Sequence, residues 1–550
     1  MPLKGRDGFY LICIRIFTLQ ILCLTAGDRY GKIIYGKKVK IMVFSQKVKI
    51  ALNAVKLLSG LEESEVMDVN DCARKLGVSP RYLEQVLYIL RKNGFVAARR
   101  GADGGYRLSD RGRNCSANDI IVAISGNDQE CADDFSGKVC RIMESAADKI
   151  AFSPEESGEI YLDNAATTAA DSDVVEKMLP YFSYIYGNAS SLHAMGRRAL
   201  NAVDEARERI AACINAKPWE IYFTCGGSES DNWAIKGAAY AMKDKGRHII
   251  TTSVEHPAVL ESCRALERCG FEVTYLPVNT RGTINISDLE NAIRKDTVLI
   301  SVMTANNETG AVMDIARVGE VAKSHSVVFH TDAVQAAGHL DLDVCKSHAD
   351  MLSLSGHKFY CPKGVGILYK RNGVKCERFM DGGEQERGRR AGTLNTPGIV
   401  AIGYALEKAC RDRVRDDARI LAMRNAFEDR LLSHKGIGQV TVHSKDSRLS
   451  SHSCLTFHGI NGHALLARLD ENKVYASIGS ACSSGSAVLS HVLTAIGVSE
   501  EDARSTLRFT FGKYNTLRQA EQAADIVAQQ AENLRISDLF ARDNADKKSV

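Results

Sequence analysis

The sequence has little net charge, no regular cysteine framework and no internal repeat, and each absence narrows what the protein can be. A formal charge of +4 over 550 residues excludes a chain whose whole surface attracts nucleic acid, so any DNA contact has to come from a local basic patch. The 16 cysteines lack the short regular spacings of a disulfide-stapled secreted domain, which predicts reduced thiols in the cytoplasm. The length favours two or three domains.

Long apolar runs are scarce as well, and the one candidate lies at the N-terminus. Residues 9–26 (FYLICIRIFTLQILCLTA) are strongly apolar and follow Lys4, as in a signal or anchor segment, but Arg15 interrupts them. A well-formed domain starts near Met42. We therefore expect residues 1–41 to be a non-native N-terminal extension, with a membrane anchor as the minority alternative.

Residues 42–148 show the order of a winged helix-turn-helix. Helical apolar spacing covers residues 45–58 and 69–77. Ser79 is an N-cap candidate followed by Pro80 at the first position of a further helix, SPRYLEQVLYILRKNGF. The stretch VAARRGADGGYRLSD then predicts a hairpin wing with a glycine-rich tip.

Basic and aromatic side chains lie where such a domain contacts DNA. Arg81 and Tyr82 begin the second helix of the pair and are placed to reach a major groove. Arginines of the wing, Arg99, Arg100 and Arg107, are placed to hold phosphates. An ordinary helical hairpin is the alternative for the two helices alone, and the wing favours DNA binding.

The same segment resembles the Rrf-type regulators, the family that includes the iron-sulfur repressor IscR, through SPRYLEQVLYILRKNGFV, RRGADGGYRL and DIIVAISG. The resemblance implies a dimer and, in many members, an iron-sulfur cluster held by three closely spaced cysteines and a fourth ligand. Here the corresponding region offers Cys131 and Cys140, with Cys115 upstream. A cluster, a redox pair and inert buried thiols all stay open as interpretations.

A small, polar and charged stretch, residues 149–158, predicts a linker, and the pattern changes after it. Short β-branched runs such as RHIITTSV, TVLISVMT and VVFHTDAV alternate with helical stretches, which predicts an α/β domain with a mostly parallel sheet over residues 159–536. Residues 537–550 are predicted to form a polar tail. Sheets of this kind bind ligands at their strand ends.

Three features of the second domain predict the protein half of a pyridoxal phosphate site. FTCGGSESDNWAIKG leads from a strand through a glycine and serine turn into a helix, which suits a phosphate, although such turns also carry glycine for packing. Asp332 follows one apolar strand and Lys358 follows another. In pyridoxal enzymes a lysine bonds to the cofactor and a carboxylate keeps the pyridine nitrogen protonated. A solvated surface lysine is the alternative for Lys358 taken alone.

The stretch from about residue 159 to 536 resembles the class V aminotransferase fold, specifically the NifS and IscS group of cysteine desulfurases. The motifs that carry the resemblance occur in the family's order: IYLDNAATT, YGNASSLHAMG, FTCGGSESDNWAIKG, TSVEHPAVL, NNETG, HTDAVQ, LSLSGHKFYCPKG, RRAGTLN, GSACSSGS and LRFTFGKYN. The resemblance implies a pyridoxal phosphate-dependent transferase fold of type I, with a smaller C-terminal α/β domain.

The resemblance also implies roles for the residues that contact the cofactor ring. Lys358 is the lysine that bonds to the cofactor, Asp332 is the partner of the pyridine nitrogen, and Gln335 approaches the ring hydroxyl. His256 stacks on the ring and assists proton transfer, with a packing histidine as the alternative.

Phosphate and substrate contacts are implied in the same way. The residues implied to hold the cofactor phosphate are Gly227, Ser228, Ser355 and His357, with Thr393 contributed by the other subunit of a homodimer. Arg508, helped by Asn307, is implied to clamp the carboxylate of the substrate.

Cys482 decides the reaction in this interpretation. Its neighbours in GSACSSGS are too small and polar to build a core, which predicts a mobile loop, with a buried structural thiol as the alternative. A thiolate at this position attacks the sulfur of bound L-cysteine and becomes a persulfide, and alanine leaves.

The leading prediction is a cysteine desulfurase that passes sulfur to an acceptor or iron-sulfur scaffold protein and is fused to a DNA-binding regulator. Such a fusion couples sulfur supply to gene control. Two alternatives are a selenocysteine lyase or other class V enzyme, and a transcription factor whose second domain only senses pyridoxal phosphate. Cys482 separates these readings, because transamination survives the loss of a thiol.

Overall fold

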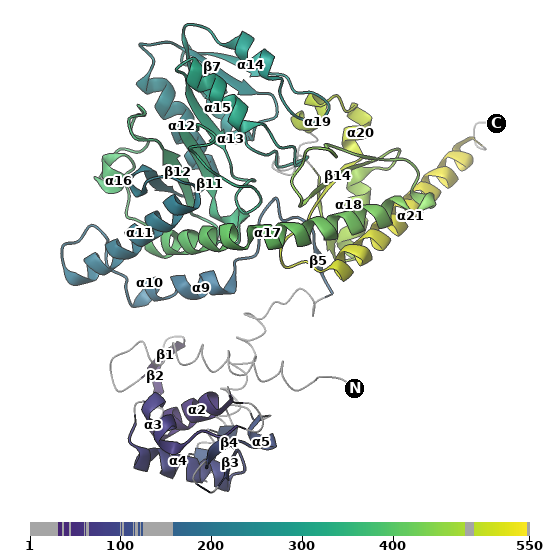
Figure 1. Ribbon diagram of the computed structural model, residues 1–550. Helices are drawn as coiled ribbons and strands as arrows, with labels where there is room; N and C mark the ends of the chain where they lie inside the picture. The colour runs from purple at the N-terminus through teal and green to yellow at the C-terminus, as the bar shows by residue number, and fades with distance from the viewer. Residues whose placement is uncertain are drawn as a thin grey trace. The chain divides into compact units, whose positions relative to one another are not determined.

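A computed structural model of the chain describes residues 31–35, 38–42, most of 46–124, then 158–478 and 489–546. The chain divides into two compact units between Ser153 and Pro154, a point within the linker predicted from the sequence (Figure 1). None of the helices in the described part of the chain combines the length and the apolar character that a membrane-spanning segment needs. The apolar stretch 9–26 lies outside the described residues.

The N-terminal unit has the predicted order of a winged helix-turn-helix. Its helices pack around a shared apolar cluster in which Leu83, Val86 and Leu87 are fully buried. Ser79 caps its helix by accepting a hydrogen bond from the backbone N–H of Tyr82. The elements are the hairpin β1 (Gly31–Tyr35) and β2 (Lys38–Met42), the helices α2 (Gln46–Ser59), α3 (Val69–Leu76) and α4 (Pro80–Lys92), the wing strands β3 (Val96–Arg99) and β4 (Gly105–Leu108), and α5 (Asp110–Arg113).

A seven-stranded sheet organises the second unit, in the order β6-β12-β11-β10-β9-β7-β8. Within this sheet β12 runs antiparallel to both of its neighbours, and the pairs from β11 to β8 are parallel, which confirms the predicted mostly parallel sheet. The strands are β6 (Ile221–Thr224), β7 (His248–Thr252), β8 (Glu272–Leu276), β9 (Thr297–Ser301), β10 (Val328–Asp332), β11 (Met351–Ser355) and β12 (Gly366–Lys370).

Helices cover both faces of this sheet, because successive residues of a buried strand point to opposite sides. Ile249 packs with α12 (Gly227–Ala241) and α13 (Pro257–Glu267), whereas its neighbour Ile250 packs on the face covered by α14 (Ile286–Ala292) and α15 (Ile315–Ser324). The remaining helices of this unit's first half are α9 (Ser172–Met178), α10 (Pro180–Ser183), α11 (Ala194–Cys213) and α16 (Gln385–Gly388).

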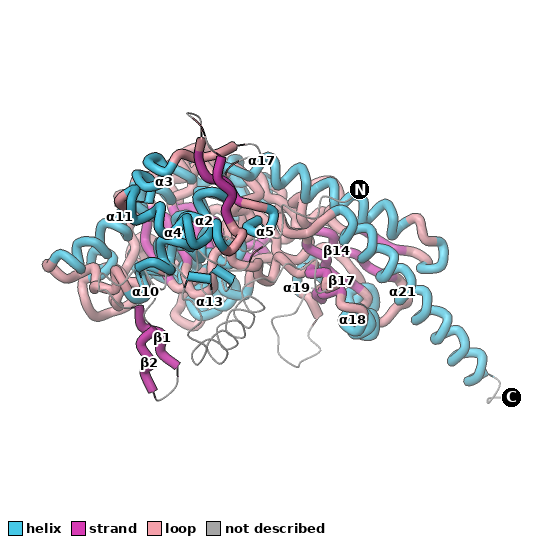
Figure 2. The backbone as a smooth tube through the Cα atoms, turned by 90° about the horizontal axis from the view of Figure 1, so that it is seen from below, coloured by secondary structure: helices cyan, strands magenta, loops and turns pink. Residues whose placement is uncertain are grey.

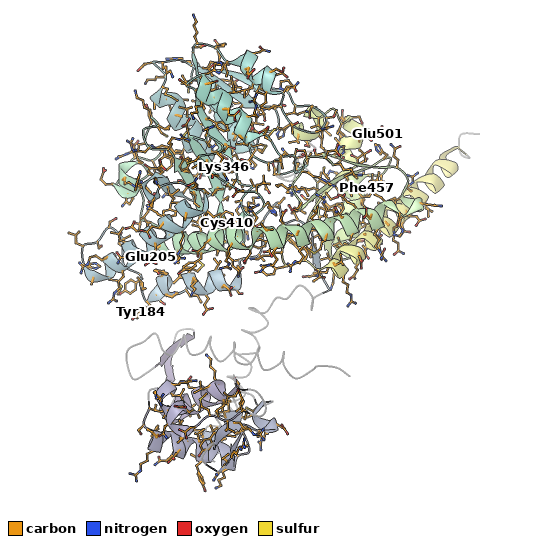
Figure 3. All side chains as sticks on the ribbon, viewed as in Figure 1. Tyr184, Glu205, Lys346, Cys410, Phe457 and Glu501 are labelled. Atoms are coloured by element: carbon orange, nitrogen blue, oxygen red, sulfur yellow. The ribbon has the colours of Figure 1, made fainter. Side chains whose placement is uncertain are left out.

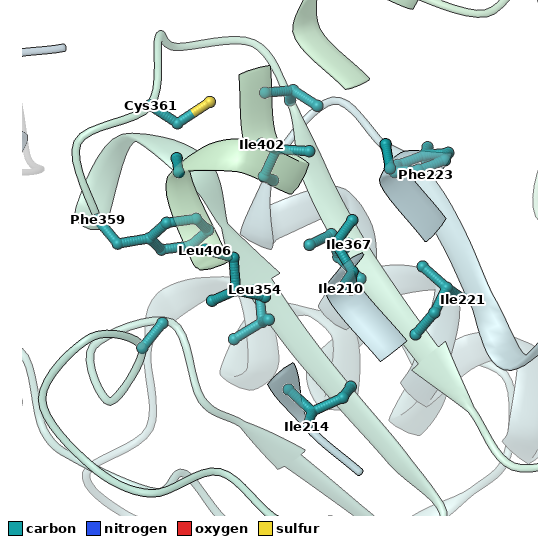
Figure 4. Close-up of a cluster of buried hydrophobic side chains, with 14 of the residues drawn as sticks. Ile210, Ile214, Ile221, Phe223, Leu354, Phe359, Cys361, Ile367, Ile402 and Leu406 are labelled. Carbon is teal, nitrogen blue, oxygen red and sulfur yellow. The ribbon is translucent and has the colours of Figure 1, made fainter. Parts of the chain in front are cut away.

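One buried cluster holds the end of β11 in place (Figure 4). Leu354 of β11 and Ile367 of β12 meet Ile210 of α11 and Ile402 of the long helix α17 (Thr396–Leu432), and each of these side chains is fully buried. Phe359 belongs to the same cluster. Its burial fixes the chain directly after Lys358, so the position of that lysine depends on this core.

A smaller antiparallel sheet, β13-β14-β17-β16, forms the C-terminal part of the second unit. Figure 2 shows β14 and β17 side by side near α18. Its elements are β13 (Val440–Val442), β14 (His452–Phe457), α18 (Gly462–Glu471), β16 (Ser477–Ile478), α19 (His491–Ala495), α20 (Glu500–Arg504), β17 (Thr506–Thr510) and α21 (Leu517–Asp546). The segment 537–546, expected as a polar tail, continues α21.

The start of the second unit returns to this smaller sheet. β5 (Ile160–Tyr161) pairs in parallel with β15 (Val474–Tyr475), and Asp163 bridges to Thr510 of β17. A chain segment more than 300 residues earlier thus borders the strand that carries Arg508. This arrangement places residues 160–163 beside β15 and β17.

Phe427 of α17 is the centre of the aromatic packing behind β17. Its ring lies 5.0 Å from that of Phe509 and 5.5 Å from that of Phe511, and it is fully buried. We expect Phe427→Ala to lower the free energy of unfolding by about 3–5 kcal/mol through lost burial and a cavity.

Chemical denaturation followed by circular dichroism measures this change. Val414→Ala is the matched control on the same helix, because Val414 is 73% exposed, and its effect is expected to stay within about 0.5 kcal/mol. Equal effects of the two substitutions contradict the assignment of Phe427 to the core.

Candidate active site

Polar residues gather at the carboxyl ends of neighbouring strands in the large sheet. β10 ends at Asp332 and β11 ends at Ser355, which leads into the short turn η2 (Gly356–Lys358). β7 ends at Thr252, and His256 follows it at the start of α13. Because these strands are parallel, their carboxyl ends lie along one edge, so the predicted ring-contacting residues come together there.

Lys358 is held by a backbone turn from the beginning of the second unit. Its Nζ donates hydrogen bonds to the carbonyl oxygens of Ala165 at 2.6 Å and Ala166 at 2.7 Å. Gln335 also reaches this turn, with its side-chain amide donating to the Ala165 carbonyl at 2.9 Å. One short segment therefore orients the predicted cofactor lysine and the residue predicted to approach the ring hydroxyl.

Asp332 is a buried carboxylate beside cationic and polarisable neighbours. Burial raises its pKa, and the nearby His256 and Lys358 act in the opposite direction by favouring the charged form. Its Oδ1 accepts a hydrogen bond from the Val334 N–H at 2.9 Å. A cation placed against Asp332 favours its charged form further, which suits a partner for a protonated ring nitrogen.

His256 has a structural role that also sets its protonation. Its Nδ1 accepts a hydrogen bond from the Ala258 N–H at 3.1 Å, so it caps α13, and the ring proton of the neutral form belongs on Nε2. Burial lowers the pKa of His256. The cap accounts for one ring nitrogen only, and the electrostatic contact with Asp332 and Lys358 places the ring among the predicted site residues.

The glycine turn before α12 has the form of an anion cradle. α12 begins at Gly227 without a side-chain cap, so its first N–H groups can serve an anion. A Cβ on Gly227 would stand 2.8 Å from Val334 and 3.4 Å from Ser355, which explains the need for glycine and shows how closely Ser355 approaches the turn. Ser228, the next residue, is exposed. These features fit the phosphate of the predicted cofactor.

His357 and Thr393 are the other residues implied to contact the phosphate. His357 hydrogen-bonds through Nδ1 to the Thr167 hydroxyl at 3.2 Å, and burial lowers its pKa to about 4, so the ring is neutral at physiological pH. Thr393 is exposed on the segment that precedes α17.

Arg508 is a buried guanidinium in β17 with partners from two distant segments. Its Nη1 donates to the backbone carbonyl of Asn307 at 2.8 Å, and its Nη2 pairs with Oδ1 of Asp163 at 2.7 Å. Asn307 thus contacts Arg508 through its backbone. The motif IYLDNAATT contains Asp163, for which the sequence predicted no role. The carboxylate in this motif was the signal from which a partner for Arg508 could have been predicted.

Cys482 lies outside the described residues, but the described residues on both sides of it belong to the site. Ser477 of β16 pairs in register with Arg508. Ser490, the N-cap of α19, donates a hydrogen bond through its hydroxyl to Glu308 at 2.5 Å. The Nε2 atom of His491 and the carbonyl oxygen of Glu255 form a hydrogen bond at 2.9 Å. Glu255 directly precedes His256 in the chain.

A second group of polar residues lies buried beneath the site, and sequence reasoning missed it. His330 of β10 hydrogen-bonds to Ser301 of β9 and to Ser353 of β11, both at 2.9 Å, and so ties three strands together. Its Nε2 lies 3.7 Å from Asp231 of α12. Burial raises the pKa of Glu255 to about 8, so this carboxyl is mostly neutral at physiological pH.

The residues predicted to contact DNA differ in the solvent exposure of their side chains. Arg81 and Arg99 are exposed, whereas Tyr82 is half-buried and packs against the core of the N-terminal unit. Arg107 is half-buried, and Arg100 lies outside the described residues.

Sequence reasoning missed Tyr88 of α4, which is 57% exposed and lies one turn beyond the exposed Gln85. Because Arg81, Gln85 and Tyr88 follow helical spacing, they form one exposed stripe on α4. Cys131 and Cys140 lie outside the described residues. In the part of the chain that the structure describes, no group of three metal-binding side chains is present.

Comparison with known families matches both units. Residues 160–522 match the class-V aminotransferase family, and residues 44–154 match the Rrf2 family, described as iron-dependent transcriptional regulators.

Individual relatives match the second unit over nearly their whole length. The chain is 47% identical over 381 residues to a cysteine desulfurase IscS of Methanosarcina thermophila, covering 69% of this chain and 94% of the relative. It is 45% identical over 398 residues to IscS of Neisseria meningitidis, covering 71% and 97%. Among solved structures, a NifS-like protein superposes with a TM-score of 0.64 at 35% identity, covering 68% and 98%. A structure described as SspA in complex with cysteine gives 0.59 at 41% identity, covering 65% and 100%.

The buried His330 predicts an acid sensitivity. Burial lowers its pKa to about 3, whereas an unfolded histidine titrates near ~6.5. Between these two pKa values the unfolded state binds a proton on His330 and the folded state does not. The free energy of unfolding therefore falls as the pH drops from about 6.5 toward 3. From pH 7 to pH 5 this one group is expected to remove about 2 kcal/mol.

We expect His330→Gln to be less stable than the original protein at pH 7, because the substitution weakens the hydrogen bonds between strands. Between pH 7 and pH 5 the free energy of unfolding of this variant is expected to fall by about 2 kcal/mol less than that of the original protein. Denaturant unfolding at the two pH values measures this. His463→Gln is the matched control at an exposed histidine. The same acid loss in His330→Gln and in the original protein contradicts the prediction.

Proposed function

The chain belongs to the class-V aminotransferase family as a cysteine desulfurase of the IscS kind fused to an Rrf2 regulator domain, and we propose that Cys482 is its sulfur-accepting thiol and Lys358 its cofactor lysine. The observation that carries this proposal is the convergence of Lys358, Asp332 and His256 at the strand ends. The turn from Asp163 to Ala166 links Lys358 to Arg508, and both described flanks of Cys482 contact these residues or their chain neighbours.

The residues at this edge fit pyridoxal phosphate. The uncapped start of α12 with Ser355 suits its phosphate, and the buried Asp332 suits a protonated ring nitrogen. When bound, pyridoxal phosphate withdraws electrons from the amino acid and so acidifies its Cα–H. We assign Lys358 as the residue that bonds to the cofactor and takes the Cα proton. Gln335, Ser228 and His357, with Thr393 from another subunit, complete the contacts.

Arg508 is proposed to receive the carboxylate of L-cysteine. Its guanidinium is buried, and among the described residues its Nε–H has no hydrogen-bond partner. A buried donor without a partner is costly unless a ligand uses it. The carboxylate of an amino acid is such a ligand, and Asn307 fixes the guanidinium from the other side through its carbonyl.

Chain length allows Cys482 to reach this site. Cys482 follows Ile478, the last residue of β16, by four positions, and four extended residues span at most about 14 Å. In the proposed reaction the Cys482 thiolate bonds to the substrate sulfur while the substrate Cβ–S bond breaks. The products are a persulfide on Cys482 and, after protonation of the remaining carbon skeleton, L-alanine.

The two alternative functions, a selenocysteine lyase and a domain that only senses pyridoxal phosphate, explain this arrangement of residues less completely. A selenocysteine lyase uses the same cofactor residues, so substrate competition separates it from a desulfurase. A domain that only senses pyridoxal phosphate would still use Lys358, Asp332 and His256 to hold it, but it has no need for the thiol of Cys482. A sulfur-acceptor or iron-sulfur scaffold protein is the proposed partner, and the reduced state that persulfide chemistry requires places the reaction in the cytoplasm.

A homodimer is proposed from an exposed apolar stretch around α10 and the start of α11. Phe182, Tyr186 and Leu192 are exposed by 61%, 69% and 89%, and Tyr184 lies at the margin of the second unit (Figure 3). Contiguous exposed apolar groups of this kind mark interaction surfaces. The contribution of Thr393 to a neighbouring cofactor site rests on the same dimer.

The Rrf2 domain is proposed to bind DNA through Arg81 and the wing arginines. An iron-sulfur cluster on Cys131 and Cys140 stays a prediction. A cluster would give the anaerobically purified protein visible absorbance that oxidation removes.

The assignment of Cys482 predicts a loss of sulfur transfer without a loss of cofactor. We expect Cys482→Ser to bind pyridoxal phosphate as the original protein does but to form alanine from cysteine at least about 100-fold more slowly, because the nucleophile is missing. Alanine and sulfide assays with mass spectrometry of the protein measure this.

Cys269→Ser is the matched control at an exposed cysteine, and it is expected to keep full activity and a persulfide of about 32 Da on Cys482. Unchanged alanine formation in Cys482→Ser contradicts the proposed nucleophile.

DNA binding predicts a difference between the two ends of α4. We expect Arg81→Ala to weaken operator binding by about 1–3 kcal/mol, whereas Lys92→Ala, an exposed cation at the other end of the helix, changes it little. Fluorescence anisotropy with a labelled operator at two salt concentrations measures both. Equal losses contradict a specific role for Arg81. Repeating the titration after cysteine has loaded Cys482 with a persulfide tests whether sulfur supply is coupled to gene control. An unchanged affinity for the operator contradicts that coupling.

A further inference from the structure

A turn of four residues, Asp163 to Ala166, contacts residues from three distant parts of the second unit. The carbonyls of Ala165 and Ala166 accept hydrogen bonds from Lys358, and Ala165 also accepts from Gln335. The turn is tied to β17 itself, because the Ala165 N–H donates to the Thr510 hydroxyl at 2.9 Å and Asp163 bridges to the same residue. This places Asp163 beside Arg508 at a fixed distance.

The ion pair between Asp163 and Arg508 is more than a surface contact. The Arg508 side chain is 5% exposed and that of Asp163 20% exposed, with 2.7 Å between Nη2 and Oδ1. At such burial solvent screens the pair weakly, so each charge acts strongly on any third charge nearby. The pair is neutral as a whole before an amino acid arrives.

A substrate carboxylate approaching Arg508 therefore meets a guanidinium that is already compensated. It gains the hydrogen bonds of the remaining N–H groups, including Nε–H, but it also meets the negative charge of Asp163. The same balance acts on the product, because L-alanine carries the same carboxylate. An uncompensated buried guanidinium would hold both amino acids more tightly and would release alanine more slowly.

We infer that Asp163 is a positioning residue that compensates the charge of Arg508 and thereby weakens the binding of amino-acid carboxylates, which favours alanine release. The inference rests on the proposed role of Arg508 as the carboxylate donor. Asp163 acts through Arg508 and does not contact the reacting atoms. A purely structural role for Asp163 predicts the opposite effect, because loss of an orienting partner weakens binding.

The test measures binding of L-alanine to the purified holoenzyme by isothermal titration calorimetry. Asp163→Asn keeps an oxygen acceptor for Nη2 and removes the charge, so we expect alanine to bind about tenfold more tightly and the KM for cysteine to fall. Ethylamine, which is alanine without its carboxylate, is expected to bind Asp163→Asn and the original protein alike. Asp163→Glu, which keeps the charge, is expected to stay within about twofold for alanine.

Thermal unfolding gives a second readout that does not need turnover. Without ligand, Asp163→Asn is expected to unfold at a lower temperature because Arg508 loses its counter-charge, and alanine is expected to raise the unfolding midpoint of this variant more than that of the original protein. If Asp163→Asn does not fold, Asp163→Ser removes the same charge and is measured instead. Weaker or unchanged alanine binding in the neutral variant overturns the inference.

Failure of the proposed substrate clamp has a different signature. Arg508→Gln is expected to lose the preference for alanine over ethylamine. If Arg508→Gln keeps that preference, Arg508 is not the carboxylate donor, and the proposal for Arg508 fails whatever Asp163 does. If Arg508→Gln loses the preference but Asp163→Asn does not tighten alanine binding, only the role of Asp163 is wrong.

Discussion

The parallel arrangement of β7, β9, β10 and β11 is the constraint on which the rest of the second unit depends. Parallel strands end at one edge, so the residues that follow each strand meet there however far apart they lie in the chain. Asp332 and Lys358 come from adjacent strands, and His256 follows another. The core behind the edge then decides how precisely they are held, and Phe359, buried directly after Lys358, is the clearest example.

Burial at this edge makes electrostatics the main organising force. Glu255 is mostly neutral at physiological pH, because burial raises its pKa to about 8, and the neutral His330 joins its strands through hydrogen bonds. Arg508 has a close counter-charge in Asp163, whereas burial raises the pKa of Asp332, and its neighbours His256 and Lys358 act against that shift. A carboxylate or a pyridinium nitrogen added to this site therefore meets few competing charges, and in a buried site its electrostatic effect is large.

Local patterns in the sequence predict the elements and the residues that end them. The cap at Ser79, the turn before α12 and the apolar strands before Asp332 and Lys358 are all signals within a few residues, and the structure has each of them. Contacts between distant segments leave no such local signal. The carbonyls of Ala165 and Ala166 that hold Lys358 lie more than 190 residues away from it, and backbone acceptors carry no side-chain identity to find. For the same reason the contact of Asn307 with Arg508 through its carbonyl was not predictable from its amide side chain.

Long-range contacts of the same kind anchor the described residues on both sides of the segment that carries Cys482. Ser477 pairs with Arg508, and Ser490 is anchored on Glu308, a buried carboxyl whose pKa burial raises to about 7. Anchors on both sides fix the ends of the segment that carries Cys482, and its length therefore sets the farthest point that the thiol proposed as the nucleophile can reach.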